Sequence, residues 1–486
     1  MTPLRTQPLR GGHPARPNTP ALPAASPATT ARPAFYLTAV YVFVVYARFP
    51  EIMDMLTGSA VHSVRIIVGL ALLATLLFGG DVRAVFSKPG ICLILFTLWL
   101  CACVPFSIWR GGSARMLRDF WLIALFSFVI TASAVQGLEQ CRKIMYTLAA
   151  ATIFIEVFTL VMGRVQGGRL ALLGGTLGNA NYLALMLLMG VPFCLFVIRT
   201  RPGPSPLKIA CLLMLFFVPV TVSTTGSRGG LVTLGIMFLI YFWPLAPNQK
   251  LVAAVAALIL AVVAIAWSTR SALDRFKTIL EPATPVHLTE SEQSAIESME
   301  LRKELLLSSL ELTMRHPLMG VGPGMFAVAN ANFAEETTGR PNWNAWHETH
   351  NTFTQLSCED GLPGVFLYCL TLLFCFGITY WAPKKARPDD PALSQVKHMA
   401  FALRLALVGF VGTALFASNA YMYYFPMLAG LCVAVDRSIT KHLAAQTAAG
   451  PAQPGATPRA AKAPAQFHPG TAAGRRAMPW KRPPFK

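Results

Sequence analysis

Long apolar stretches recur along the whole chain and alternate with short polar connections. Most approach the roughly 20 apolar residues that an α-helix needs to cross a bilayer. The pattern predicts an all-α integral membrane protein with about twelve transmembrane helices. The first, seventh and last two stretches are short or interrupted. The expected spans run near residues 35–50, 60–79, 90–108, 119–136, 144–163, 181–198, 209–222, 230–246, 251–268, 363–381, 399–418 and 421–436.

One polar segment, residues 269–362, is much longer than the other connections and predicts a structured loop with short helices. Its residues 289–292, Thr-Glu-Ser-Glu, form a capping box. Apolar residues at helical spacing follow to about Met314. Three glycines between 320 and 324 then indicate a turn, and we expect a second short helix from near His350 to Gly361.

The two ends of the chain differ from the apolar middle. Residues 1–34 and 438–486 are rich in Pro, Ala and basic residues, and we predict two disordered cytoplasmic tails. Nine helices then fall in 35–268 and three in 363–437. Basic residues gather in the tails and in every second loop, which by the positive-inside rule puts both termini in the cytoplasm. The long loop is therefore expected outside, which is the periplasm in a Gram-negative cell.

Composition supports the membrane assignment and narrows the range of possible binding partners. Of the 486 residues, 54% are hydrophobic and only 13% are charged, too few charges for an ordinary soluble protein. The net charge is +19, yet residues 269–363 carry 13 acidic and 7 basic side chains, so this segment is at −6 and the rest at +25. The distribution of basic residues agrees with the positive-inside rule and with contact between basic residues and anionic membrane lipids. No nucleic-acid-binding motif accompanies it, and no CxxC pair supports a zinc or redox site.

Two arginines are candidates for binding an anion. Arg228 follows Gly226 and precedes Gly229 and Gly230, which would let backbone approach a ligand at the start of the next helix. The alternative is an arginine that reaches from a helix end to the membrane interface. Arg302 borders the apolar face of the expected loop helix, where the alternative is an ordinary solvated charge.

Two histidines lie three residues apart, at His347 and His350. Such a pair can bind a metal, but HExxH is absent and no further ligand cluster is evident. A general base fits one histidine better, because the histidine pKa lies near neutral pH. A histidine held structurally at a helix start is the alternative. Arg164 and Arg169, in a loop on the same side, are expected either to contact substrate or to anchor at the interface.

Four motifs, in the order in which they occur along the chain, resemble those of the O-antigen ligase and polymerase superfamily of bacterial membranes. His350-Asn351, nine residues, Gly361, two residues and Gly364 fit the H[NSQ]-x9-G-x-x-[GTY] signature of O-antigen ligases. The other three pieces are GNANYLA at 178–184, TGSRGG at 225–230 and RHPLMGVGPGMF at 315–326. The chain is most similar to the ligases.

The resemblance implies a GT-C-like membrane glycosyltransferase. Such ligases transfer a glycan from undecaprenyl diphosphate to lipid A–core at the periplasmic face of the inner membrane, with inversion and without a metal or other cofactor. It implies that His350 is the general base and that Arg228 and Arg302 hold the diphosphate. We add Arg164, Arg169, Asn351 and His347 as substrate-binding candidates.

Other functions remain open at this point. A polysaccharide polymerase for O-antigen, exopolysaccharide or capsule would use the same lipid-linked donor with a second glycan as acceptor. A protein O-glycan ligase would use a serine or threonine acceptor. A secondary transporter for a small anion would also suit many spans and a basic chain, but the two halves show no clear repeat.

Overall fold

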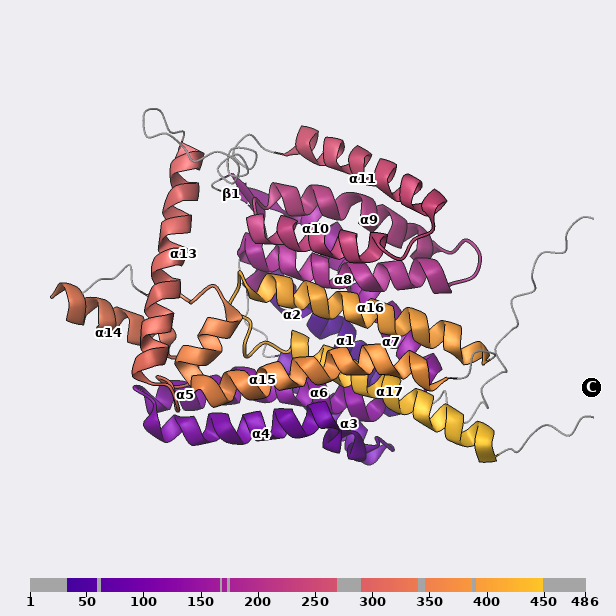
Figure 1. Ribbon diagram of the computed structural model, residues 1–486, viewed down its shortest axis with the longest axis horizontal. Helices are drawn as coiled ribbons and strands as arrows, with labels where there is room; N and C mark the ends of the chain where they lie inside the picture. Colours follow the sequence, from indigo (N-terminus) through magenta and orange to yellow (C-terminus); the bar gives the residue numbers. More distant parts are fainter. Residues whose placement is uncertain are drawn as a thin grey trace, which may run out of the picture. The chain divides into compact units, whose positions relative to one another are not determined.

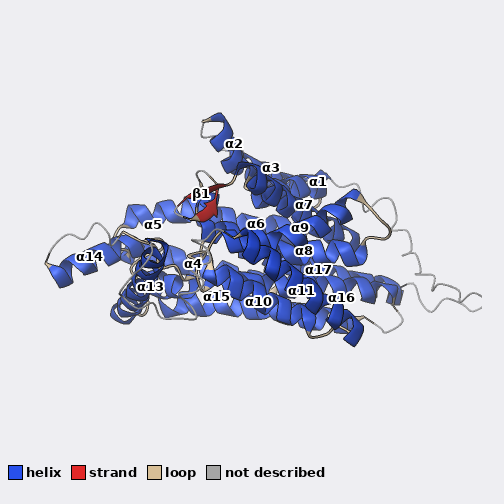
Figure 2. Cartoon of the chain, turned by 90° about the horizontal axis from the view of Figure 1, so that it is seen from above, coloured by secondary structure: helices blue, strands red, loops and turns tan. Residues whose placement is uncertain are grey.

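A computed structural model describes residues 33–58, 63–166, 168–172, 175–268, 290–339, 346–386 and 390–448. Within these ranges the structure is helical apart from one small hairpin (Figures 1 and 2). The helices are α1 Pro33–Tyr46, α2 Phe49–Thr57, α3 Ser63–Leu77, α4 Lys88–Cys103, α5 Arg110–Met116, α6 Leu122–Ala134, α7 Leu138–Met162, α8 Ala180–Thr200, α9 Pro206–Thr224, α10 Arg228–Phe242, α11 Pro247–Trp267, α13 Glu290–Arg315, α14 Phe326–Thr338, α15 Thr352–Lys385, α16 Pro391–Ala414 and α17 Tyr424–Ala448. Strands β1 Arg164–Gln166 and β2 Arg169–Ala171 pair antiparallel, with Val165 opposite Leu170.

The all-α membrane prediction is confirmed. Each of the twelve expected spans overlaps a helix, and eight helical segments among the described residues are long and apolar enough to cross a membrane. The pair α1 and α2, bent by 58°, would add a ninth. Helices α3 and α10 are apolar but shorter. The positions of the predicted helices are therefore right. By length and composition alone, eight or nine of the described helical segments qualify as spans, and the expected total of twelve stays a prediction.

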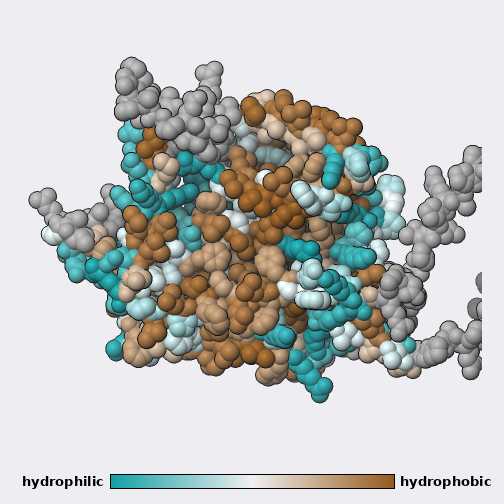
Figure 3. All heavy atoms as spheres, in the orientation of Figure 1, coloured by the Kyte–Doolittle hydropathy of each residue, from teal (hydrophilic) through white to brown (hydrophobic). Residues whose placement is uncertain are grey.

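The helices pack around α8, most of which is buried. Helices α7, α9 and α16 contact it, α15 packs against α4, and α11 lies on α9 with nearly all of its other surface exposed. Apolar residues form a band across the visible face of the bundle, while hydrophilic residues gather near α13 and at the opposite end (Figure 3). This is the surface expected of helices that face lipid between two aqueous ends.

The long polar segment contains two helices, α13 and α14. The expected loop helix is α13, which ends at Arg315, one residue after its predicted end. Helix α13 runs across the ends of the apolar helices and packs on α15 (Figure 1). Thr289, the first residue of the expected capping box, lies outside the described residues.

The second loop helix does not stop at Gly361 as the sequence suggested. It is the first part of α15, which continues to Lys385 with a break at Gly361, where φ is 73°. The Leu362 N–H donates to the carbonyl oxygen of Pro317 at 2.8 Å, so the chain bends toward the end of α13 and then resumes the helix. A predicted loop helix and a predicted transmembrane helix are thus one element.

The expected start of the C-terminal tail, residue 438, lies inside the last helix. Helix α17 runs to Ala448, past the boundary at 438, because its last turns have partners in the bundle. Ile439 is buried beside Val396, and Arg437 and Lys441 bond to the carboxylate of Asp81. The rest of that tail, 449–486, and residues 1–32 of the N-terminal one lie outside the described residues.

Candidate active site

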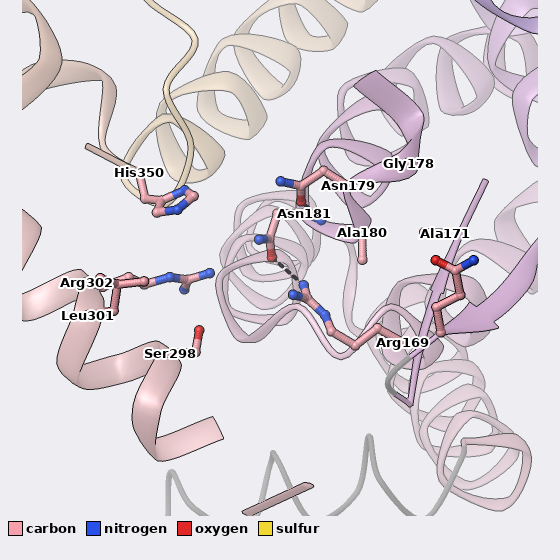
Figure 4. Close-up of a pocket in the computed structure, with 11 residues that line it drawn as sticks. Arg169, Ala171, Gly178, Asn179, Ala180, Asn181, Ser298, Leu301, Arg302 and His350 are labelled. Atoms are coloured by element: carbon pink, nitrogen blue, oxygen red, sulfur yellow. Dashed lines mark hydrogen bonds between the residues drawn. The ribbon is translucent and has the colours of Figure 1, made fainter. Parts of the chain in front are cut away.

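A cleft of about 440 Å³ lies where α13 faces the start of α8 and the β hairpin (Figure 4). Three segments contribute polar side chains to it. Arg302 extends into the cleft from α13, Arg169 enters from β2, and the ring of His350 comes from the segment before α15 (Figure 4). The remaining lining residues are Gln166, Ala171, Gly178, Asn179, Ala180, Asn181, Ser298 and Leu301.

His350 is held in an unusual backbone conformation, with φ at 53°. A left-handed conformation is uncommon outside glycine, and it persists only where surrounding contacts hold it. The His350 N–H donates to the Ser418 hydroxyl at 3.0 Å, and the hydroxyls of Thr349 and Ser418 are hydrogen-bonded at 3.1 Å. Thr352 then donates to the carbonyl oxygen of Ala417 at 2.7 Å. The loop after α16 therefore fixes the histidine.

Asn351 caps α15 rather than lining the cleft. Its side-chain oxygen accepts from the N–H groups of Phe353 at 2.9 Å and Thr354 at 3.2 Å. An asparagine at this position satisfies donors at a helix start that otherwise lack a partner. The His-Asn pair of the signature thus has two parts, a histidine directed into the cleft and an asparagine that starts the helix behind it.

The turn at 320–324 docks on α15 and thereby fixes the end of α13. The N–H groups of Val321 and Gly322 donate to the carbonyl oxygens of Cys358 and Glu359 at 2.8 and 2.9 Å. The buried Glu359 carboxylate accepts from the N–H of Gly324 at 3.1 Å. Thr313, near the end of α13, is bonded to Ser357 at 2.9 Å. These contacts place α13, and with it Arg302, beside the His350 segment.

Arg169 is held at two points. Its Nε donates to the carbonyl oxygen of Thr225 at 2.9 Å and its Nη2 to Oδ1 of Asn181 at 2.8 Å. Asn179 caps α8 by accepting from the Asn181 N–H at 2.9 Å. The two asparagines line the cleft and were not among the residues that sequence reasoning selected. Their signal was present in GNAN, directly before a long apolar stretch.

The surroundings of His350 lower its pKa to about 4. Burial contributes most, because it disfavours the charged imidazolium, and the positive charge of Arg302, of His347 when protonated and of Arg169 adds to the effect. The ring is therefore neutral at neutral pH and able to accept a proton. The cleft combines two cations, of which Arg169 is fixed by hydrogen bonds, with one neutral imidazole, an arrangement suited to an anionic leaving group and a hydroxyl nucleophile.

Residues 209–369 match the family model described as O-Antigen ligase. The match covers about a third of the chain and supports the O-antigen ligase and polymerase family. No curated protein matches the chain. The matched segment runs from α9 into α15 and includes Arg228, Arg302 and His350. The match supports an enzyme of the ligase and polymerase type, that is, a membrane glycosyltransferase-like protein with lipid-linked glycans as its substrate class.

Arg228 lies in the matched segment but is not among the described residues that line the cleft. It begins α10, with Ser227 as the cap, one turn away from the Thr225 carbonyl that Arg169 contacts. The neighbouring glycines approach protein rather than a ligand: a Cβ on Gly229 would collide with the ring of Phe416. Gly229 therefore packs against the residues just after α16, and the role of Arg228 in binding an anion stays a prediction.

The other candidates have separate locations. Arg164 lies on the exposed strand β1, opposite Ala171, and does not line the cleft in the described structure. His347 is partly exposed and lies close enough to His350 to influence its pKa. Of the seven residues proposed from the sequence, the structure brings His350, Arg302 and Arg169 together in one cleft.

Proposed function

We propose that this chain is a ligase that transfers a glycan from undecaprenyl diphosphate to lipid A–core. The observation that carries the proposal is the cleft in which Arg302, Arg169 and His350 converge from three separate segments. The family match of residues 209–369 supplies the substrate class. A polyprenyl diphosphate suits a cleft that contains two arginines and lies at the start of the apolar helix α8.

The proposed reaction is a single displacement. A ring nitrogen of neutral His350 accepts the proton of the acceptor hydroxyl while the oxygen forms a bond to the anomeric carbon of the donor sugar. The bond between that carbon and the diphosphate oxygen breaks, and undecaprenyl diphosphate leaves with the electron pair. Attack opposite the leaving group inverts the anomeric configuration.

Arginines supply the charge that the leaving diphosphate needs. Arg302 and Arg169 each offer a planar group of N–H donors that matches phosphate oxygens. Because Arg169 is already fixed by Thr225 and Asn181, its charge needs little rearrangement during the reaction. Arg228, Arg164 and His347 are proposed further contacts as the donor enters, with Asn351 acting through the position of His350.

The direction of insertion follows from the charges at the helix ends. Helices α8 and α15 begin at the cleft, so Arg199 and Arg201 of one and Lys384 and Lys385 of the other lie at the far end. Basic residues favour the cytoplasmic side. We therefore place the protein in the bacterial inner membrane with both termini in the cytoplasm and the cleft in the periplasm. The segment 269–362 is then periplasmic, between the helices of 35–268 and those of 363–437.

The test is lipopolysaccharide from a strain that lacks the gene, complemented with the wild type or with His350→Ala. The proposal expects unsubstituted core and accumulated lipid-linked glycan, corrected by the wild type alone at equal protein levels. Core that carries a single repeat would instead identify a polymerase for O-antigen. An unchanged pattern of O-antigen would overturn the ligase proposal, and full correction by His350→Ala would overturn the base assignment.

A further inference from the structure

A second groove lies on the other side of the segment that carries His350. It consists of two adjoining cavities of about 260 Å³ each, which share Phe120, Tyr421 and Met422. One cavity is lined by Glu348 and Thr349, the residues just before His350. We call these two cavities together the second groove.

Neighbouring residues line the second groove and the cleft at two places. At the first, His350 lines the cleft while Thr349, its neighbour, lines the groove. At the second, Gly178 lines the cleft and Thr176 lines the groove. The cleft and the second groove thus adjoin at the segment that carries the proposed base. They could bring two substrates together from different directions, as a transfer between two large molecules requires.

The charge of the groove differs from that of the cleft. Its arginines are paired within the protein: Arg48 with Glu51, and Arg65 with Asp119 at 3.0 Å. Glu51 also accepts from the Thr176 N–H at 2.9 Å. Among the described residues that line the groove, these pairings leave little cationic character to hold a diphosphate. Carboxylates instead accept hydrogen bonds from hydroxyl groups, which a neutral sugar offers in number.

An aromatic side chain projects into both cavities from a π-helical turn at Leu117–Trp121. Phe120 in this turn is 48% exposed, whereas the next residue, Trp121, is fully buried. Trp121 donates to the Thr97 hydroxyl at 2.9 Å and contacts the Phe96 ring edge-on, so the turn is firmly held. The π-helix occurs mostly as single turns inside α-helices, and these turns are frequent at functional sites. Here the turn presents an apolar ring face amid carboxylates.

We infer that the second groove binds a sugar ring of the acceptor glycan, with Phe120 as the surface on which the ring stacks. The inference rests on the proposed function and adds the acceptor's binding site to it. Carboxylates around an exposed aromatic ring match a pyranose, which has hydroxyls on its rim and C–H groups on its face. The acceptor hydroxyl then reaches His350 from the groove, and the diphosphate lies in the cleft.

The experiment measures transfer by the purified full-length protein in lipid vesicles. The donor is undecaprenyl-diphosphate-linked glycan, and the acceptor is lipopolysaccharide that ends at the core, each varied in turn. Phe120→Ala is expected to raise the KM for core by roughly five- to tenfold, with the KM for donor and the kcat near wild type. Phe120→Tyr, which keeps the ring, is expected to restore the KM. Phe366→Ala, at an exposed ring that lines neither cavity, is the matched control.

The outcomes separate the inference from the proposed function. If the wild type is active and Phe120→Ala leaves the KM for core unchanged, the inference is wrong. A rise in the KM for donor alone would assign the groove to the donor glycan and would also overturn it. If the wild type transfers nothing to core, the ligase proposal fails by itself, whatever the variants do.

Discussion

The Nε of Arg169 donates a hydrogen bond to the backbone carbonyl of Thr225 at 2.9 Å, and this bond ties the β hairpin to the turn before α10. A second bond from the same guanidinium, to Asn181, ties the hairpin to the start of α8. Arg169 is therefore both a cation of the cleft and a link between three segments. A charge held in this way is prepared for a developing anion before the substrate arrives.

Replacement of Arg169 by alanine is expected to lower the transfer rate by about 100-fold, as loss of one fixed donor to a charged transition state commonly does. Arg169→Lys should recover only part of the activity, because an ammonium group lacks the planar donors that contact Thr225 and Asn181 together. The measurement is kcat/KM for donor in vesicles. Arg164→Ala, in the exposed paired strand, is the matched control and should change the rate less than about threefold. Equal losses in both variants would contradict the role of Arg169.

The pH dependence follows from the low pKa of His350, about 4 in the free protein. The base must be unprotonated, so kcat/KM should be flat from neutral pH down to about pH 5 and fall about tenfold per unit below the pKa. Arg302→Gln removes a positive neighbour and should move this limb to higher pH, since the imidazolium is then less disfavoured. Recovery of activity after return to neutral pH controls for unfolding. A limb that stays in place in Arg302→Gln would show that another group is titrating.

Helices could be predicted from the sequence because each is encoded locally. A bilayer-length apolar stretch defines α7 or α8 without reference to any other part of the chain. The end of α17 could not be predicted, since Ile439 and Arg437 are held by residues far away in sequence. The same is true of the break at Gly361, which depends on the position of Pro317 in space.

The types of residue in the candidate site could be predicted from the sequence. Which particular residues line the cleft was harder to predict. The His-Asn signature identified His350, and the border of the apolar face of the expected loop helix identified Arg302. Both residues line the cleft. The sequence reasoning favoured Arg228 over Arg169, whereas among the described residues it is Arg169 that lines the cleft. The order could not be predicted, because it depends on the packing of α10 near α16 and on the path of the hairpin. Asn179 and Asn181 were visible in the motif, but a helix cap and a cleft-lining residue have the same sequence signal.

Gly361 has a conformation that other residues rarely adopt, and a Cβ there would collide with the backbone carbonyl of Leu318. Gly361→Ala is expected to destabilise the protein by about 1–3 kcal/mol and to lower its thermal midpoint. Gly377→Ala, in the same helix with open space around the added Cβ, is the control and should be neutral or slightly stabilising. Thermal unfolding of the purified variants decides between them, and equal midpoints would show that the break at Gly361 is not required.

Ser418 accepts a hydrogen bond from the His350 N–H at 3.0 Å and is bonded to Thr349, so it positions the proposed base although it is not among the described residues that line the cleft. Ser418→Ala leaves His350 without the contact that fixes its left-handed backbone, and kcat should fall about tenfold. The KM for donor should stay the same, because Arg302 and Arg169 are untouched. Ser418→Thr keeps the hydroxyl and should regain most of the rate, while Ser438→Ala, at a buried serine in α17, tests for a general packing effect. A loss of donor affinity equal to the loss of kcat would mean that Ser418 supports the whole cleft rather than the histidine.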